Sequence, residues 1–168
     1  MSKSNYHHGN VEQALLEAAM LMLEADGAEA LSLRKISKKI DVTPTAAYNY
    51  FVDKDALIVA IKVRAFTLFT GLIEGNIEAQ HTAEQRIVGI GKAYLNFTLE
   101  HPAMAHLLWH VPVVESRITK EFIEVGLRGE AAIRQALHDL LVQHGIEPKE
   151  ESVILATSLA WSQIHGLS

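Results

Sequence analysis

The 168-residue sequence predicts an all-α fold, in which a small N-terminal head of three helices precedes a larger helical bundle. Apolar residues recur at helical spacing along most of the chain, so most segments have one apolar face. The alternation typical of strands is absent, and β-branched residues form only short clusters. Residues that cap helices stand before most of these segments. We expect the head over residues 1–56 and the bundle over residues 57–168.

Local signals bound the first three helices. Asn10 is a typical N-cap for the first helix, and Gly27 is a typical terminator. Ser32 is expected to cap the second helix. Thr43 is expected to cap the third, with Pro44 at its first position, where the missing N–H group is not needed. Residues 10–50 therefore predict three short helices.

The fourth helix, capped by Asp53, is too long to belong to the head alone, so we expect it to link the head to the body. Its inward residues are expected to be Leu57, Ile58, Ile61, Ala65, Leu68, Leu72 and Ile73. Four later helices are expected to begin near Thr82, Pro102, Ser116 and Pro148. Gly126 and Gly129 would bend the seventh helix or let another helix approach it closely.

The composition excludes several classes of protein. There is no cysteine, which excludes disulfides and cysteine-based zinc sites. The first ten residues lack the apolar core of a signal peptide, and no uninterrupted apolar run approaches the roughly 18–20 residues of a membrane span. No fingerprint of a nucleotide-binding loop, a serine hydrolase or a zinc protease occurs. We expect a soluble, cytoplasmic protein that is not an enzyme, needs no cofactor and has no membrane partner.

The charge is unevenly distributed. The whole chain has a net charge of −5, which by itself argues against a nucleic-acid partner. Residues 32–54 nevertheless contain five basic and two acidic residues, a net charge of +3, whereas residues 65–168 contain seven basic and twelve acidic residues. Attraction to phosphates falls off within about 8 Å at physiological salt, so a local basic patch suits DNA binding. Ordinary solvated helix faces would give the same numbers.

Residues 31–57 have the layout of a helix-turn-helix, the element that places a short helix in a DNA major groove. Its turn is Ile40–Thr43 in sequence order Ile-Asp-Val-Thr, with Asp41 where such turns favour glycine. Thr45 and Asn49 could contact base edges, and the short side chain of Ala46 would let the helix come close to them. Tyr48, Tyr50 and Lys54 are placed to contact backbone phosphates, as is the hydroxyl of Thr43.

The alternative is an ordinary helical hairpin with aromatic residues in its core. Phe51 and Leu57 are expected to be core residues in either case. Tyr48 and Tyr50 cannot both lie on one helix face, because positions i and i+2 diverge. At least one of these two tyrosines should therefore be exposed, which weakens the alternative.

The same segment resembles the TetR family of one-component regulators. The resemblance rests on Gly27, Leu31-Ser32-Leu33-Arg34, Ile36-Ser37, Ile40, Val42-Thr43-Pro44, Tyr48, Tyr50-Phe51, Lys54 and Leu57. Residues 6–10 and the C-terminal Trp161-x-x-x-His165-Gly166 resemble the subgroup whose ligand domain carries a Trp-x-x-x-His-Gly signature. The spacing of Tyr94, Phe97 and His101-Pro102 fits that subgroup too. Asp41 departs from the glycine usual in the family.

The resemblance implies a homodimeric repressor that binds a palindromic double-stranded DNA operator and releases it when a small apolar effector binds the body. It implies DNA contacts from Lys3, Arg34, Thr43, Thr45, Ala46, Tyr48, Asn49, Tyr50 and Lys54. Most members have a further helix where this chain ends, so the sequence leaves open a truncation after Ser168. A helical dimer or small-molecule-binding module without sequence-specific DNA function is the alternative.

The body offers candidate residues for an effector pocket, namely Tyr94, Phe97, His106, Leu107, Trp109, His110, Phe122, Trp161 and His165. Aromatic residues at helical spacing more often simply fill a core, and for any single residue we favour that interpretation. His106 and His110 have the i, i+4 spacing of metal ligands, but no carboxylate lies in the same stretch. We therefore expect no metal site.

Overall fold

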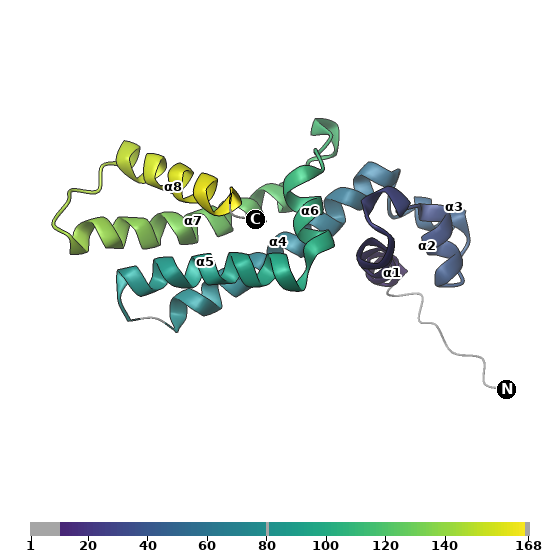
Figure 1. Cartoon of the computed structure of the whole chain (residues 1–168). Coiled ribbons are helices and arrows are strands. Elements are labelled where there is room, and N and C mark those ends of the chain that lie inside the picture. Colours follow the sequence, from purple (N-terminus) through teal and green to yellow (C-terminus); the bar gives the residue numbers. More distant parts are fainter. Residues whose placement is uncertain (1–10, 80, 167–168) are drawn as a thin grey trace.

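The computed structural model describes residues 11–79 and 81–166, and these are almost entirely helical (Figure 1). The helices are α1 Val11–Asp26, α2 Leu33–Lys39, α3 Pro44–Tyr48, α4 Lys54–Glu78, α5 Ala83–Glu100, α6 Pro102–His110, α7 Lys120–Gln143 and α8 Glu150–His165. Two short 3-10 turns, η1 Ala28–Ala30 and η2 Glu115–Arg117, lie between them. The described residues contain no strand, so the predicted all-α fold is confirmed.

The head and the body lie at opposite ends of an elongated molecule. Helices α1, α2 and α3 form the head, while α5, α7 and α8 surround the far end of α4 (Figure 1). The 25-residue α4 runs from one end to the other and packs on α1 in the head and on α5, α6 and α7 in the body. Helix α4 is therefore in contact with helices at both ends of the molecule.

Most of the predicted caps are present. Thr43 Oγ1 accepts a hydrogen bond from the N–H of Ala46 at 3.2 Å, and Asp53 Oδ1 accepts one from Ala56 at 2.8 Å. Thr82 forms a complete capping box with Gln85. Gly27 ends α1 with a φ of 78°, a left-handed conformation that glycine adopts without strain. The predicted Asn10 cap lies outside the described residues.

Ser32 stands at the N-cap of α2, but its side chain makes no capping hydrogen bond, so that prediction is wrong in its detail. Leu68 is also misassigned, because it is 38% exposed although α4 buries most of its other predicted inward residues. The seventh helix begins at Lys120 rather than near Ser116, since residues 115–117 form η2 and Thr119 caps α7. The eighth begins at Glu150, two residues after Pro148.

The two glycines of α7 differ in their surroundings. A Cβ atom added to Gly129 would lie 3.0 Å from Thr70 Oγ1 of α4, whereas one added to Gly126 would meet nothing within 4 Å. Gly129 therefore permits a close approach of α4 and α7, which is one of the two roles expected for these glycines, and Gly126 is not needed for it.

Helix α4 has the length and apolar composition of a membrane span, although no uninterrupted apolar run in the sequence does. More than half of its apolar window, 56%, is buried inside the protein. The core helix of a bundle meets the same criteria, because it is apolar on several faces and packs against neighbours on each of them. Its apolar composition is accounted for by that packing.

Candidate nucleic-acid interface and ligand cavity

Helix α3 is held in the head by its smallest side chain. Ala47 is fully buried and Phe51, just after the helix, is 4% exposed, so these two residues anchor the segment in the core formed with α1 and α2. The small Ala47 lets α3 pack closely on its neighbours, and the opposite face of the helix is left to solvent. The predicted core role of Phe51 is confirmed, as is that of Leu57.

The turn between α2 and α3 closes the end of α2 with two hydrogen bonds. The N–H of Val42 donates to Ser37 O at 3.0 Å, and that of Asp41 donates to Lys38 O at 3.4 Å. Together these bonds are the Schellman pattern, which requires a left-handed residue at the position of Asp41. Asp41 has a φ of 57° and is the one described non-glycine residue with a positive φ. Asp41 therefore occupies the left-handed position for which such turns favour glycine, as the sequence indicated.

The predicted nucleic-acid contacts on α3 lie on its outer side. Thr45, Tyr48 and Asn49 are exposed, and Ala46 is half-buried. Tyr48 is 47% exposed and Tyr50 is 44% exposed, which contradicts the alternative of an aromatic hairpin core. Arg34 and Thr43 are exposed as well, and so are the remaining basic residues of α2, namely Lys35, Lys38 and Lys39.

Two predicted contacts stand apart from this face. Tyr50 lies beyond the end of α3 and lines a surface groove with Leu16 of α1 and Val63 of α4. Lys54 Nζ donates to the backbone carbonyl of Glu29 in η1 at 3.2 Å, so its ammonium group is partly engaged within the head. Lys3 lies outside the described residues. The DNA-binding roles of these residues stay predictions.

Two polar contacts join α4 and its N-cap to the end of α6 and the α6–α7 connection. Arg117 of η2 donates from Nε to Asp53 Oδ2 at 2.9 Å and from a second nitrogen to the same carboxylate at 2.5 Å. These bonds, above all, hold the pKa of Asp53 below its usual value, and the N–H of Ala56 adds to the effect. The carboxylate therefore caps α4 and fixes the α6–α7 connection at once.

Lys62, in the middle of α4, makes the second contact. Its side chain is 2% exposed, and its ammonium group donates to the carbonyl oxygens of Leu108 and Val111 at the end of α6. Burial lowers the pKa of Lys62, because the charged form loses its hydration. The end of α6 is thus tied to α4 by a buried cation.

The body contains a cluster of aromatic side chains in mutual contact. Trp161 of α8 lies 5.0 Å from Trp109, 5.8 Å from Tyr94 and 6.4 Å from Phe69, measured between ring centroids. The rings meet mostly edge to face, which is a favoured geometry for aromatic pairs. Trp161 therefore attaches the outer helix α8 to α4, α5 and α6.

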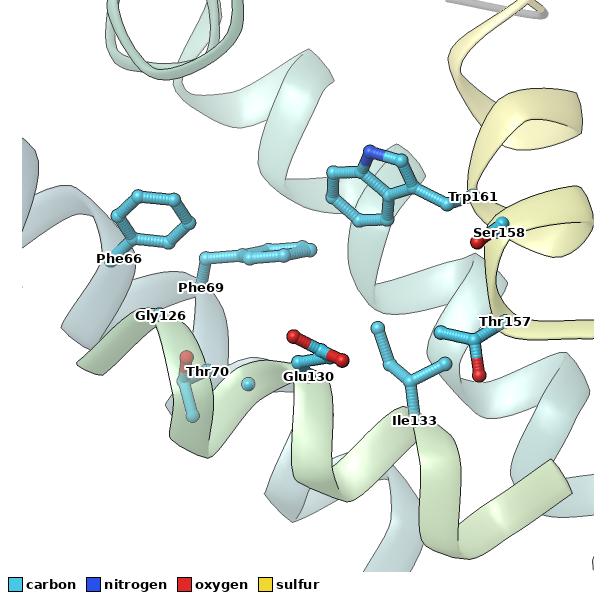
Figure 2. Close-up of a pocket in the computed structure, with 10 residues that line it drawn as sticks. Phe66, Phe69, Thr70, Gly126, Glu130, Ile133, Thr157, Ser158 and Trp161 are labelled. Carbon is cyan, nitrogen blue, oxygen red and sulfur yellow. The ribbon is translucent and has the colours of Figure 1, made fainter. Parts of the chain in front are cut away.

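A cavity of about 370 Å³ opens beside this cluster, between α4, α7 and α8. Figure 2 shows Phe66, Phe69 and Trp161 along one side and the carboxylate of Glu130 opposite them. Thr70 completes the wall at the base. The size and the mixture of aromatic and few polar groups are typical of sites for small molecules.

A second cavity of about 240 Å³ lies between α5, α7 and α8. It shares Phe69, Ile133 and Trp161 with the first, and its other walls are mostly apolar. No charged residue is found among the described residues that line it. The two cavities therefore lie next to each other, with Trp161 in the wall of both.

The predicted pocket residues are divided among several environments. Trp161 lines both cavities and Tyr94 lines the smaller one, whereas Phe97 and Leu107 are fully buried in the core. Trp109 and His165 pack against Trp161. Phe122 packs on Phe66 at 5.7 Å, and His106 and His110 stack on each other at an exposed position.

Four residues that line the cavity were not predicted from the sequence, namely Phe66, Phe69, Thr70 and Glu130. The first three occupy positions i, i+3 and i+4 of α4, so their shared helix face was visible in the sequence. Glu130 had no such signal, because its relation to α4 depends on how α7 packs. Within the described ranges, no group of three histidine, aspartate or glutamate residues could hold a metal ion.

His165 lies close to the aromatic cluster, with its ring 4.6 Å from that of Trp161 and 5.1 Å from that of Trp109. Burial lowers the pKa of His165, and the nearby His110 lowers it further. The imidazole is therefore held in its neutral form over a wider pH range than a free histidine.

Two family models match the chain. Residues 15–61 match the model for bacterial regulatory proteins of the tetR family, and residues 87–168 match the tetracyclin repressor-like C-terminal domain. The uncharacterized HTH-type transcriptional regulator YobS of Bacillus subtilis is 26% identical over 172 residues, which cover 92% of this chain and 89% of that protein.

Solved structures give the same picture. A protein with unknown function from Rhodococcus sp. RHA1 is 26% identical, with a TM-score of 0.81 over 98% of this chain and 84% of that one. The transcriptional regulator FadR from Bacillus subtilis, in complex with stearoyl-CoA, is 17% identical, with a TM-score of 0.71 over 91% of this chain and 82% of that one. At that level of identity, the likeness to FadR shows the fold alone.

Proposed function

The chain belongs to the TetR family of DNA-binding transcriptional regulators, and from this premise we propose that it is a homodimeric repressor, which binds a palindromic operator and releases it when a small molecule enters the body. We also assign its body to the subgroup with the Trp161-x-x-x-His165-Gly166 signature. The packing of His165 on Trp161 beside the cavities supports that assignment.

The observation that carries the proposal is the outward face of α3. Thr45, Tyr48 and Asn49 are exposed on a helix whose one buried residue is Ala47. A structural hairpin gains nothing from these side chains, whereas a major-groove helix needs hydroxyl and amide groups that reach base edges and phosphates. The exposed basic residues of α2 supply the electrostatic attraction that accompanies them.

The dimer interface is proposed on the outer face of α8. Ile154, Leu155 and Leu159 are 45%, 60% and 56% exposed, and Leu127 of the neighbouring α7 is 59% exposed. Large apolar side chains that gather on one face of a monomer mark an interaction surface. A twofold pairing of this face would place two heads side by side, as a palindromic operator with half-sites about 34–36 Å apart requires.

The effector is proposed to enter the larger cavity and to act on the head through α4 and its partners. Arg117 holds the α6–α7 connection to Asp53, at the start of α4. Lys62 of α4 holds the end of α6. A ligand between α4, α7 and α8 would shift α7 relative to α4, and the contacts of Arg117 and Lys62 would transmit this shift to α4. A small rotation of α4 then changes the separation of the two heads, which must match fixed half-sites.

The test of the function begins with selection of DNA from a random duplex library by the purified full chain. We expect an enriched palindrome. On that sequence, Lys54→Ala and Tyr48→Phe should weaken binding to all DNA, and the salt slope should fall by about one for the lysine. Asn49→Ala should instead change which bases are preferred, with each lost base contact worth about 1–3 kcal/mol.

Matched controls are available in the body. Lys92 is an exposed lysine on α5, a helix of the body, so Lys92→Ala should leave both DNA affinity and salt slope unchanged. Leu155→Glu on α8 should produce monomers and weaken operator binding, whereas Leu99→Glu on α5, which is 80% exposed, should do neither. No enriched DNA sequence, or full affinity in the Lys54 and Tyr48 variants, would refute the proposed interface.

The proposed coupling has its own control pair. Arg117 and Arg128 each bind a carboxylate of α4, Asp53 near the head and Glu74 at the far end. Arg117→Ala should reduce the ability of an effector to release DNA, because the contact next to the head is lost. Arg128→Ala should leave release unchanged, and equal effects of the two variants would contradict this route.

A further inference from the structure

The cavity between α4, α7 and α8 contains an acidic side chain. Of the ten described residues that line it, Glu130 is the only charged one, and its carboxylate points into the space below Phe69 and Trp161 (Figure 2). The side chain of Glu130 is 51% exposed, and its ionic neighbour among the described residues is Arg134, at 3.7 Å, whose guanidinium is shared with Glu150 at the same distance. These contacts are too long for hydrogen bonds, so the oxygens of Glu130 keep their capacity to accept.

Aromatic rings line the cavity opposite the carboxylate (Figure 2). Phe66, Phe69 and Trp161 come from α4 and α8, and all three line the cavity. A ring face attracts a cation through its quadrupole, and the attraction is larger where water is excluded. An acidic group and several aromatic rings around one space form an environment that stabilises a positive charge and disfavours a negative one.

The neighbouring cavity suits an apolar tail. It shares the wall residues Phe69, Ile133 and Trp161 with the first cavity, and it is also lined by Ile87, Ile90 and Leu137. Apolar surface that enters such a space is removed from water, which favours binding in proportion to the area buried. The two spaces together therefore separate a charged end from an apolar end.

We propose that the body binds an organic ammonium ion with an apolar tail, whose nitrogen lies between Glu130 and the rings of Phe66, Phe69 and Trp161, and whose tail extends into the cavity between α5 and α8. The inference rests on the proposed effector role of this cavity, and it names the class of effector. A fatty carboxylate or a phosphorylated ligand would place its charge against Glu130 and is therefore disfavoured.

Three probes with the same eight-carbon tail test the assignment, namely octylammonium, octanoate and 1-octanol. Binding to the full-length protein is measured by calorimetry at pH 7 and by quenching of tryptophan fluorescence, since Trp161 lies in the cavity wall. We expect octylammonium to bind most tightly and octanoate most weakly. Glu130→Gln should weaken octylammonium binding by about tenfold and leave 1-octanol binding unchanged.

Glu124→Gln is the matched control, because Glu124 is an exposed carboxylate on the same helix whose partner is Lys120 rather than the cavity. A second variant tests the tail. Gly91 lines the smaller cavity with open space around it, so Gly91→Leu should fill the cavity and abolish the gain in affinity from butylammonium to octylammonium. Gly75→Leu, on an exposed part of α4, should retain that gain.

The outcomes separate this inference from the proposed function. Octanoate binding as tightly as octylammonium, equal affinities in Glu130→Gln and wild type, or no binding of any probe would overturn the ammonium assignment. Selection of an operator and its release by an effector of another class would leave the repressor proposal standing. Conversely, Glu130-dependent binding of octylammonium without any DNA recognition would support the cavity assignment and refute the repressor.

Discussion

Replacing Gly129 by alanine should destabilise the protein, whereas the same change at Gly126, one turn earlier on α7, should stabilise it. Alanine in a helix interior is favoured over glycine by about 0.5–1 kcal/mol, and this gain applies to both positions. Gly126 has open space where the new methyl group would lie. At Gly129 the methyl group would lie 3.0 Å from Thr70 Oγ1, which is tighter than ordinary van der Waals contact.

The size of the effect at Gly129 follows from the rigidity around it. Thr70 is 1% exposed, and both residues lie where α4 and α7 pack together. Neither the threonine side chain nor the new methyl group can therefore move freely into solvent. Overpacking of such sites typically costs about 1–3 kcal/mol. We therefore expect the free energies of unfolding of the two variants to differ by about 2 kcal/mol, which corresponds to roughly 4–8 °C in Tm.

The assay is urea denaturation followed by circular dichroism, at one fixed protein concentration because dimerisation contributes to stability. The Thr70→Ala variant supplies the double-mutant cycle, since it removes the atom that the new methyl group meets. Thr70→Ala with Gly129→Ala should recover most of the loss, with a coupling energy of about 1–2 kcal/mol. Equal stabilities of the Gly126 and Gly129 variants, or a coupling energy near zero, would refute the reasoning.

Three further predictions concern stability and its pH dependence. Asp41→Gly should raise the free energy of unfolding by about 0.5 kcal/mol, because glycine adopts the φ of 57° without strain, and Asp41→Asn should stay close to wild type; a less stable glycine variant in urea denaturation would contradict this. Lys62→Met removes a buried cation whose pKa is lowered in the folded protein. The wild-type protein gains stability as this lysine loses its charge between its folded pKa and the ordinary value of 10.5, so the stability of Lys62→Met relative to wild type should decrease from pH 7 to pH 10. An unchanged difference in urea denaturation would argue against the burial effect. The pKa of His165 is also lowered in the folded state, so the stability held by its neutral ring is present above about pH 6.5 and lost as the pH falls through the folded pKa; thermal unfolding at pH 7 and pH 5 should show a larger loss for wild type than for His165→Gln, and parallel losses would refute it.

The candidate nucleic-acid interface was largely predictable from the sequence because its determinants are local. Thr43 and Pro44 start α3 within a few residues, and the N–H groups of Asp41 and Val42 end α2 through bonds to residues three and five positions earlier, respectively. The divergence of positions i and i+2 predicted that at least one of Tyr48 and Tyr50 is exposed, and the structure exposes both. Lys54 shows the limit of this reasoning, since its bond to Glu29 joins residues 25 positions apart.

The residues of the body cavities were predicted only in part, because Trp161 and Tyr94 line them and the other predicted pocket residues do not. Aromatic side chains in the body indicated a pocket, yet Phe97 and Leu107 belong to the core, while Phe66, Phe69 and Glu130 form the walls. Periodicity identifies the apolar face of each helix, but it does not say which neighbour that face meets or where packing leaves space. Those facts depend on contacts between residues that are tens of positions apart in the chain.

The sequence by itself determined the family, the all-helical fold, the order of the helices and most of their ends, because helical periodicity, capping bonds and turn conformations act over a few residues. The tertiary structure decided that Gly129 rather than Gly126 permits the contact with α4, that Arg117 reaches Asp53, and that Glu130 faces the aromatic rings. Each of these depends on the position of one helix relative to another. That position is set by packing over the whole body, and no short stretch of sequence contains it.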